Sequence, residues 1–243
     1  MSVERLILEK WKSRDYTVLE TACHWAGIEV IRVPKSALGA LAEKTPIEGT
    51  ALHGGTSFCR KVARLLGGRV LEPVDDFLPS LPRQYSNRTL ELTTLAQARS
   101  ITGRWFIKPV NDKFFPAGVY ENGAEVPSTI HGDAIAVITS DPVTWEVEYR
   151  LFVLDRKVRA ISPYGLADGV RVEPQIEVDA RAFGEAVLAD PAVLLPRAVV
   201  LDVGIIQGVG WAVVEANTAV MSGIYDCEPL DVLEVLAAGI EPA

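Results

Sequence analysis

Residues 213–229 read VVEANTAVMSGIYDCEP, and this stretch decides the fold that the sequence predicts. Its first part is an apolar strand pattern that carries a carboxylate, Glu215, and a carboxamide, Asn217, two positions apart. Side chains on a strand alternate between its two faces, so Glu215 and Asn217 share one face. A loop of small residues follows. The stretch therefore predicts a strand that ends in a polar site.

The preceding strand pattern, AVVLDVG at residues 198–204, joins this one through IIQGVG. A type II′ turn at Gly208-Val209 would make the two strands a hairpin. Counting outward from that turn places Asp202 opposite Glu215, provided that neither strand contains a bulge. Two buried carboxylates without a nearby cation would be costly, and Mg²⁺ accepts such oxygen ligands together with phosphate oxygens. The local alternative is a set of polar side chains that face solvent at a strand end.

Composition and charge narrow the class of protein. The chain has 243 residues, of which 49% are hydrophobic and 23% charged, as in globular proteins of one large or two small domains. Its apolar runs are too short to cross a bilayer and no cleavable signal pattern is present, so we expect a cytoplasmic protein without a membrane partner. The net charge of −8 argues against a nucleic-acid partner. Scattered cysteines and histidines predict neither a disulfide framework nor a zinc site.

The first part of the chain predicts a small α/β layer. A helix over residues 17–27 ends at Gly27, and IEVIRVP at residues 28–34 follows as a strand. TALH at residues 50–53 is a second strand, and the turn GGTS leads into another helix, with Thr56 or Ser57 as its cap. GGTS is either such a capped turn or an anion site formed by backbone N–H groups.

The second part of the chain predicts an α+β domain with antiparallel sheets. A proline-rich linker, EPVDDFLPSLPRQY at residues 72–85, separates the two parts, so we predict domains at 1–80 and 81–243. Thr94 and Gln97 resemble a capping box, and residues 179–190 predict a further helix. Strand patterns otherwise follow one another closely, which favours antiparallel pairing. These patterns are RWFIKPV, AIAVIT, VEYRLFVL, VRAISPY, AVVLDVG and WAVVEAN.

Three cationic side chains and one acidic side chain accompany these strands. Lys108 lies near the end of an apolar strand and Lys113 in the loop after it, where lysines can hold phosphates. Glu148 and Arg150 share one strand face, opposite the apolar face of the same strand. On local features alone, these two are equally well explained as a solvated ion pair.

Taken together, the motifs resemble the ATP-grasp superfamily. The resemblance rests on Lys108-Pro109, ITSDPVTW, EYRLFV at residues 148–153, Asp202, and Glu215-Ala216-Asn217. EYRLFV in particular is similar to a divergent clade that includes the eukaryotic assembly factor for translation initiation factor 2 and many bacterial and phage proteins. The resemblance covers residues 80–229. It implies two α+β lobes whose antiparallel sheets sandwich ATP, preceded by the small α/β domain.

The resemblance also implies roles for individual residues. Lys108 would contact the α- and β-phosphates, Arg88 would contact a phosphate in place of a lysine, and Lys113 would lie above the triphosphate. Arg150, with Lys108, would be catalytic, stabilising the transferred phosphoryl group or the acyl-phosphate. The remaining nucleotide contacts would come from Thr139, Ser140, Val143 and Glu148. The ligands of one or two Mg²⁺ ions would be Asp202, Glu215 and Asn217.

Two parts of the sequence depart from the family pattern or extend it weakly. The loop NDKFFPAG holds only Gly118 where relatives have a glycine-rich phosphate loop. The small pair Ser222 and Gly223, with Tyr225, lies where relatives approach substrate and gives weaker site candidates.

Three functions remain open at this point. The first is an ATP- and Mg²⁺-dependent ligase that activates a carboxylate as an acyl-phosphate for attack by an amine or thiol, with a peptide or protein among the expected substrates. The second is an ATP-binding assembly factor without ligase activity. The third is a binding module whose motifs have lapsed, against which the intact acidic trio and Lys108 argue.

Overall fold

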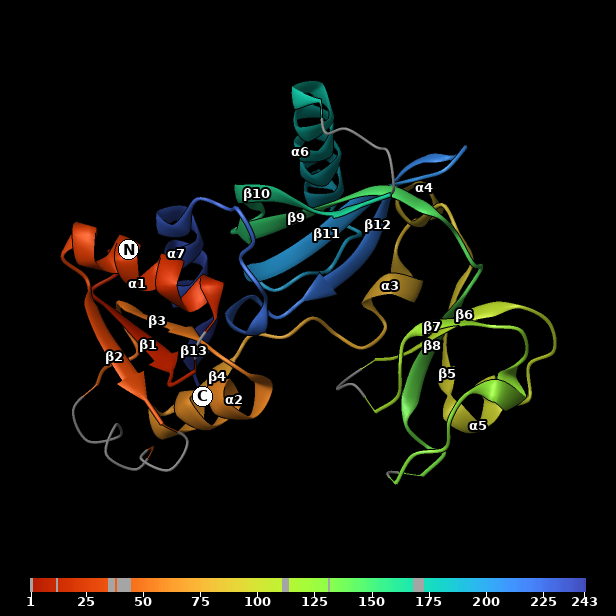
Figure 1. The fold of residues 1–243 in the computed structure, drawn as a ribbon, viewed down its shortest axis with the longest axis horizontal. Helices are drawn as coiled ribbons and strands as arrows, with labels where there is room; N and C mark the ends of the chain where they lie inside the picture. Colours follow the sequence, from red (N-terminus) through yellow and green to blue (C-terminus); the bar gives the residue numbers. More distant parts are fainter. Residues whose placement is uncertain are drawn as a thin grey trace.

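The computed structural model describes residues 2–11, 13–34, 38, 45–110, 114–130, 132–167 and 173–243. Figure 1 shows an N-terminal layer, a central sheet and a smaller sheet side by side. The α+β class and the ATP-grasp architecture predicted from the sequence are confirmed. None of the described helices combines the length and the hydropathy needed to span a bilayer. The cytoplasmic location stays a prediction.

The N-terminal layer is a parallel sheet with helices packed against it. Strands β1 (Arg5–Glu9), β2 (Glu29–Val33) and β3 (Thr50–His53) pair in the order β2-β1-β3, with helices α1 (Arg14–Ala26) and α2 (Thr56–Leu65) in the connections. The predicted end of α1 is confirmed, since Gly27 adopts a left-handed φ of 69°. The central strand β1 was not among the predicted elements.

The start of α2 differs from the prediction. Its N-cap is Gly55, which has no capping side chain, so the prediction of Thr56 or Ser57 is wrong. The carboxylate of Glu9, at the end of β1, accepts the backbone N–H of Gly55 at 2.8 Å instead. An acidic side chain of the protein itself therefore takes the place that a bound anion would have at this helix terminus.

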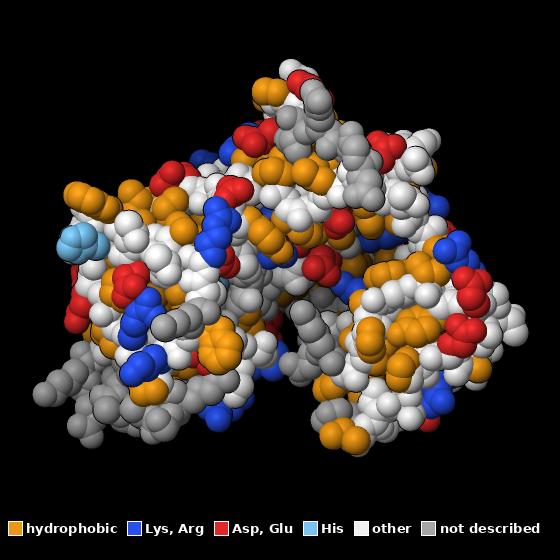
Figure 2. Space-filling view, in the orientation of Figure 1, with side chains coloured by type: hydrophobic (Ala, Val, Ile, Leu, Met, Phe, Trp, Pro, Cys, Tyr) orange, Lys and Arg blue, Asp and Glu red, His pale blue; other side chains and the backbone are white. Residues whose placement is uncertain are grey.

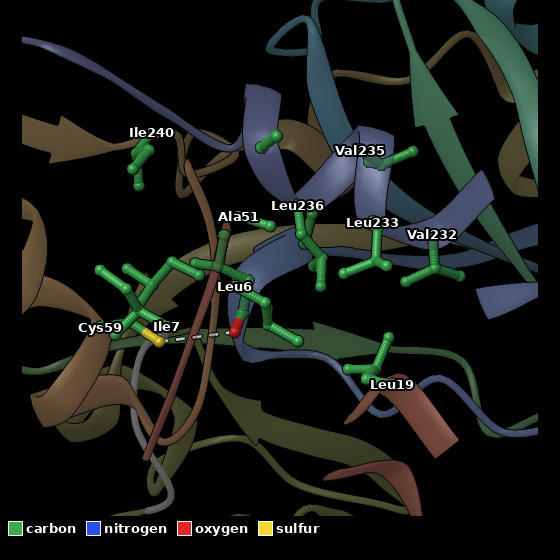
Figure 3. Close-up of a cluster of buried hydrophobic side chains, with 14 of the residues drawn as sticks. Leu6, Ile7, Leu19, Ala51, Cys59, Val232, Leu233, Val235, Leu236 and Ile240 are labelled. Carbon is green, nitrogen blue, oxygen red and sulfur yellow. Dashed lines mark hydrogen bonds between the residues drawn. The ribbon is translucent and has the colours of Figure 1, made fainter. Parts of the chain in front are cut away.

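The end of the chain returns to the N-terminal layer. Helix α7 (Pro229–Ala238) packs on β3, and strand β13 (Ile240–Pro242) pairs with β4 (Gly68–Val70). Figure 3 shows side chains of α7 interleaved with those of β1 and α1, and a hydrogen bond from Cys59 Sγ to the carbonyl oxygen of Val220. One hydrophobic core therefore contains residues from both ends of the chain, while a boundary at residue 80 stays a prediction.

The central sheet is antiparallel, in the order β10-β9-β11-β12. Its strands are β9 (Trp145–Leu154), β10 (Lys157–Leu166), β11 (Ala198–Ile206) and β12 (Gly210–Asn217). Helix α6 (Pro174–Ala189) covers one face, where Tyr149, Leu151 and Val153 are buried. The opposite face carries the polar side chains of the site, as the alternation along β9 predicted.

The smaller sheet is also antiparallel, in the order β5-β8-β6-β7. Its strands are β5 (Leu90–Thr94), β6 (Trp105–Pro109), β7 (Gly118–Tyr120) and β8 (Ala136–Ser140). Short helices α5 (Leu95–Ala98) and η2 (Gly123–Glu125) flank it, and the capping box of Thr94 and Gln97 is confirmed. The predicted proline-rich linker contains two short helices, α3 (Phe77–Ser80) and α4 (Arg83–Ser86).

Candidate active site

The hairpin of β11 and β12 places Asp202 directly opposite Glu215, as predicted. The turn itself differs, because the closing pair is Ile206 and Gly210 and the loop holds one residue more than a two-residue turn. An extra residue, Val214, then bulges out of β12 between the turn and the site and restores the register. The pairing is therefore confirmed, although the assumption of a hairpin without a bulge is wrong.

Arg88 holds this bulge in place. Its guanidinium donates to the carbonyl oxygens of Val213 at 2.7 Å and Val214 at 3.0 Å, and to that of Ser86 at 3.1 Å. The group lies over the ring of Trp145, with 5.1 Å between Cζ and the ring centroid. Burial lowers the pKa of Arg88 to about 10, while nearby carboxylates oppose this effect. Arg88 thus fixes the strand from which Glu215 projects.

Arg150 and Asp202 form a buried, two-pronged ion pair. Arg150 Nε donates to Asp202 Oδ1 at 2.9 Å and Nη2 donates to Oδ2 at 2.7 Å. Arg150 Nη1 also donates to the carbonyl oxygen of Gly223 at 3.1 Å. Burial raises the pKa of Asp202 to about 6, although the hydrogen bonds and charge of Arg150 act in the opposite direction. Because Arg150 pairs with Asp202 inside the protein, the interpretation of Glu148 and Arg150 as a solvated ion pair is wrong.

Lys108 of the smaller sheet reaches across to the central sheet. Its Nζ lies 2.6 Å from Glu215 Oε2. The amide of Asn217 donates to Glu215 Oε1 at 2.8 Å and to Asp202 Oδ2 at 3.0 Å. Burial alone would raise the pKa of Glu215, but the charge of Lys108 and the hydrogen bonds from Asn217 and Lys108 outweigh it and lower that pKa. The cations that neutralise the acidic residues therefore come from β6 and β9, far away in the sequence.

Tyr164 is a site residue that the sequence analysis missed. It is the extra residue of a bulge in β10, between Pro163 and Gly165 in the ladder to β9. Its hydroxyl donates to Glu148 Oε2 at 2.8 Å, and burial raises the pKa of Glu148. A two-residue alternation gives no signal for a side chain that a bulge has redirected.

An aromatic pair covers Arg150. The rings of Tyr164 and Tyr225 are stacked with 5.3 Å between centroids, and Arg150 Cζ lies 5.2 and 5.1 Å from their respective centroids. Tyr225 has a left-handed φ of 49°, which is uncommon for a non-glycine residue and is often found at functional sites. The structure thus brings Tyr225, a weaker candidate, into contact with Arg150.

Helix α1 also reaches the site, which the sequence did not indicate. Asp15 Oδ2 accepts the backbone N–H of Ile224 at 3.0 Å, and Arg14 forms an ion pair with Asp226. Gly223, whose carbonyl oxygen accepts from Arg150, directly precedes Ile224. The N-terminal layer therefore helps to position the loop that contacts Arg150.

The other predicted site residues are distributed between the sheets. Thr139 and Ser140 are buried at the end of β8, and Val143 lies in the segment that joins the two sheets. Ser222 is buried, and its hydroxyl donates to the carbonyl oxygen of Thr218 at 2.8 Å. Lys113 lies outside the described residues.

A cleft of about 920 Å³ opens beside these residues. One wall holds Lys108, Glu215 and Asn217, and the facing wall holds Thr56 and Arg60 of α2. The segment from β4 to α3, with Glu72 and Asp75, and the apolar side chains of Phe114 and Phe115 complete the lining. In Figure 2 the surface is hollowed between the N-terminal layer and the smaller sheet. The cleft is large enough for a nucleotide-sized ligand or a second substrate.

The acidic residues fit a magnesium ion by the chemistry of their donor atoms. Asp202, Glu215 and Asn217 lie within hydrogen-bonding distance of one another and offer hard oxygen atoms. The described part of the chain contains no group of three or more His, Cys, Asp or Glu side chains that could hold a metal. A metal at this site therefore depends on the amide of Asn217 as well as on the two carboxylates.

Comparisons with known proteins agree with this architecture. Residues 85–235 match a family model for the ATP-grasp domain, the second family of a clade within that superfamily. A comparison with curated proteins finds no match.

Solved structures share the fold at low sequence identity. A RimK domain protein ATP-grasp from Sphaerobacter thermophilus is 18% identical with a TM-score of 0.56, and the alignment covers 97% of each chain. The D-cycloserine synthetase DcsG is 14% identical with a TM-score of 0.59, over 96% of this chain and 98% of that one. The D-alanine–D-alanine ligase from Bacillus anthracis is 11% identical with a TM-score of 0.53, over 97% and 96%. The family match and the shared fold together establish that this chain belongs to the ATP-grasp superfamily.

Proposed function

We propose that this protein is an ATP- and Mg²⁺-dependent ligase that joins a carboxylate to an amine or thiol through an acyl-phosphate. The observation that carries the proposal is the connected network of Lys108, Glu215, Asn217, Asp202 and Arg150 beside the cleft. This network combines anionic metal ligands with cations that can face phosphates. Such a combination suits phosphoryl transfer, in which charge stabilisation and positioning supply most of the rate enhancement.

The residues of the smaller sheet and of its connections would hold the nucleotide. Lys108 would bind the α- and β-phosphates, and Lys113 would lie above the triphosphate. Arg88 donates three hydrogen bonds to backbone carbonyls, and a guanidinium has five N–H groups, so it retains donors for a phosphate. The remaining nucleotide contacts would come from the segment around Thr139, Ser140 and Val143 and from Glu148.

The central sheet would hold the metal and the reacting groups. Asp202, Glu215 and Asn217 would bind Mg²⁺, which when bound neutralises phosphate charge. A substrate carboxylate oxygen would attack the γ-phosphorus, with ADP as leaving group. The amine nitrogen would then attack the carbonyl carbon, inorganic phosphate would depart, and the nitrogen would lose a proton to solvent. Arg150, held by Asp202 and Gly223, would stabilise the charge of the transferred group.

The printed names of two structural relatives are consistent with ligation. They are a D-cycloserine synthetase and a D-alanine–D-alanine ligase, and the likeness in itself concerns the fold. A peptide or protein remains among the proposed substrates here. The second candidate is an assembly factor that uses bound ATP without ligation, and it differs from the first in the products that it forms.

Calorimetric titration with a non-hydrolysable ATP analogue, with and without Mg²⁺, tests the nucleotide site. We expect binding that depends on Mg²⁺ and is lost in Glu215→Gln. The matched control is Glu185→Gln, because Glu185 is exposed on α6 and lies outside the network. Equal binding by both variants would contradict the proposed metal site.

A screen for ADP release against amino acids and peptides then tests ligation. Acceptor-dependent ADP release with a new amide or thioester product supports the ligase. Stoichiometric binding of a protein partner, without such release, would overturn the ligase in favour of the assembly factor.

A further inference from the structure

Every oxygen of the two carboxylates in the proposed metal site already accepts a hydrogen bond. Glu215 accepts from Asn217 at Oε1 and from Lys108 at Oε2. Asp202 accepts from Arg150 at both oxygens and from Asn217 at Oδ2. The two negative charges are thus balanced by two cations before any ligand is added.

The two cations differ in how firmly they are held. Arg150 is 7% exposed, contacts the carbonyl oxygen of Gly223 and lies against two tyrosine rings. Lys108 projects from β6 across the cleft, on a flexible four-carbon stem, and its ammonium contacts Glu215. Of the two, Lys108 is the cation that can leave its carboxylate with little rearrangement of the protein.

A free divalent cation and a metal–nucleotide complex would meet this pair differently. To reach Glu215, a free cation would have to displace the ammonium of Lys108, which would remain near it without a new partner and repel it. A metal–polyphosphate complex brings phosphate oxygens that offer Lys108 a replacement for the carboxylate. The exchange of partners then leaves every charge compensated.

We therefore propose that Lys108 guards Glu215, so that the site takes a divalent metal as a complex with a nucleoside triphosphate and rejects the free ion. This inference rests on the proposed function, since it assigns the form in which the metal enters the same site. It gives Lys108 a second task besides phosphate binding, and it predicts opposite effects of one substitution on two ligands.

Titration with Mn²⁺, which is also bound by oxygen ligands, tests the proposal without any catalytic turnover. Free Mn²⁺ is measured by electron paramagnetic resonance in the absence of nucleotide for the wild type, Lys108→Met and Lys108→Gln. We expect both variants to bind Mn²⁺ at least about tenfold more tightly than the wild type, because a unit charge at contact distance changes the binding of a cation by more than that factor. The same variants should lose affinity for the ATP analogue. Lys157→Met, at the exposed turn between β9 and β10, makes the same change in net charge and should leave Mn²⁺ binding unchanged.

Equal Mn²⁺ affinity in the wild type and both Lys108 variants would overturn the proposal while leaving nucleotide binding intact. A second measurement uses the wild type alone, in case the variants fold poorly. Mn²⁺ with the ATP analogue should raise its Tm and Mn²⁺ alone should not; an equal rise from Mn²⁺ alone would refute the guarding role. No rise in either case would overturn the proposed function, and this inference with it.

Discussion

The buried imidazole of His53 makes the stability of this protein depend on pH in a way that can be calculated. His53 ends β3, is 4% exposed, and lies edge-on to Tyr16 with 5.2 Å between ring centroids. Its Nδ1 has no hydrogen-bond partner among the residues that the structure describes. Burial lowers the pKa of His53 from 6.5 to about 4. The folded protein therefore keeps this side chain neutral at pH values where the unfolded chain binds a proton.

The direction and size of the effect follow from this difference. Between pH 6.5 and 4 the unfolded state binds more protons at this position, so the free energy of unfolding falls as the pH falls. A pKa difference of about 2.5 corresponds to about 3 kcal/mol over the whole window, at 1.36 kcal/mol for each pKa unit. At pH 5 the loss relative to pH 7.5 amounts to about 2 kcal/mol.

Urea unfolding of the wild type and His53→Gln at pH 7.5, 6 and 5 measures this term. Carboxylates also titrate over this range, but they contribute to both proteins, so the stability difference between the two isolates the imidazole. We expect the free energy of unfolding of the wild type, relative to His53→Gln, to fall by about 2 kcal/mol from pH 7.5 to 5. His24→Gln, at an exposed position near the end of α1, serves as a control without this dependence. A wild-type-to-His53→Gln difference that stays constant with pH would refute the reasoning.

Two further predictions concern packing and buried charge. Asp202→Asn should lower the free energy of unfolding by about 3 kcal/mol, because Arg150 would stay buried without its charged partner. Asp155→Asn, in an exposed ion pair, should cost less than about 1 kcal/mol, and urea unfolding compares the two. Gly123→Ala should destabilise the smaller sheet by more than about 2 kcal/mol, since its Cβ would lie 2.0 Å from a backbone carbonyl oxygen of α5. Gly118→Ala meets no atom within 4 Å, and equal Tm values for the two alanine variants would contradict this account.

Strand alternation was enough to predict most of the central sheet and the partners of Asp202. The pattern along β9 separated Arg150 from the buried face, and counting along the hairpin paired Asp202 with Glu215. That count succeeded because two deviations cancel, a longer turn and the bulge at Val214. Neither deviation has a sequence signal as clear as the alternation itself.

The remaining parts of the site depend on contacts between distant segments. The ion pair of Lys108 with Glu215 joins two sheets, and the hydrogen bond from Ile224 to Asp15 joins the loop after β12 to the first helix. Local periodicity describes one element at a time and contains no information on such pairs. Strand β1 was missed for a related reason: a short apolar run buried on both faces lacks the alternation of a half-buried strand.

The shared core of the two chain ends has a consequence for how the protein is made. On a ribosome, β1, α1 and β3 emerge long before α7, the helix that covers them, has been synthesised. Loop-closure entropy must be overcome across most of the chain before Leu6 and Leu19 meet Leu233 and Leu236. Until then the nascent N-terminal layer exposes an apolar face to which chaperones could bind. We expect the N-terminal layer to become resistant to proteolysis only after residue 238 has left the exit tunnel, so its folding waits for the end of the chain.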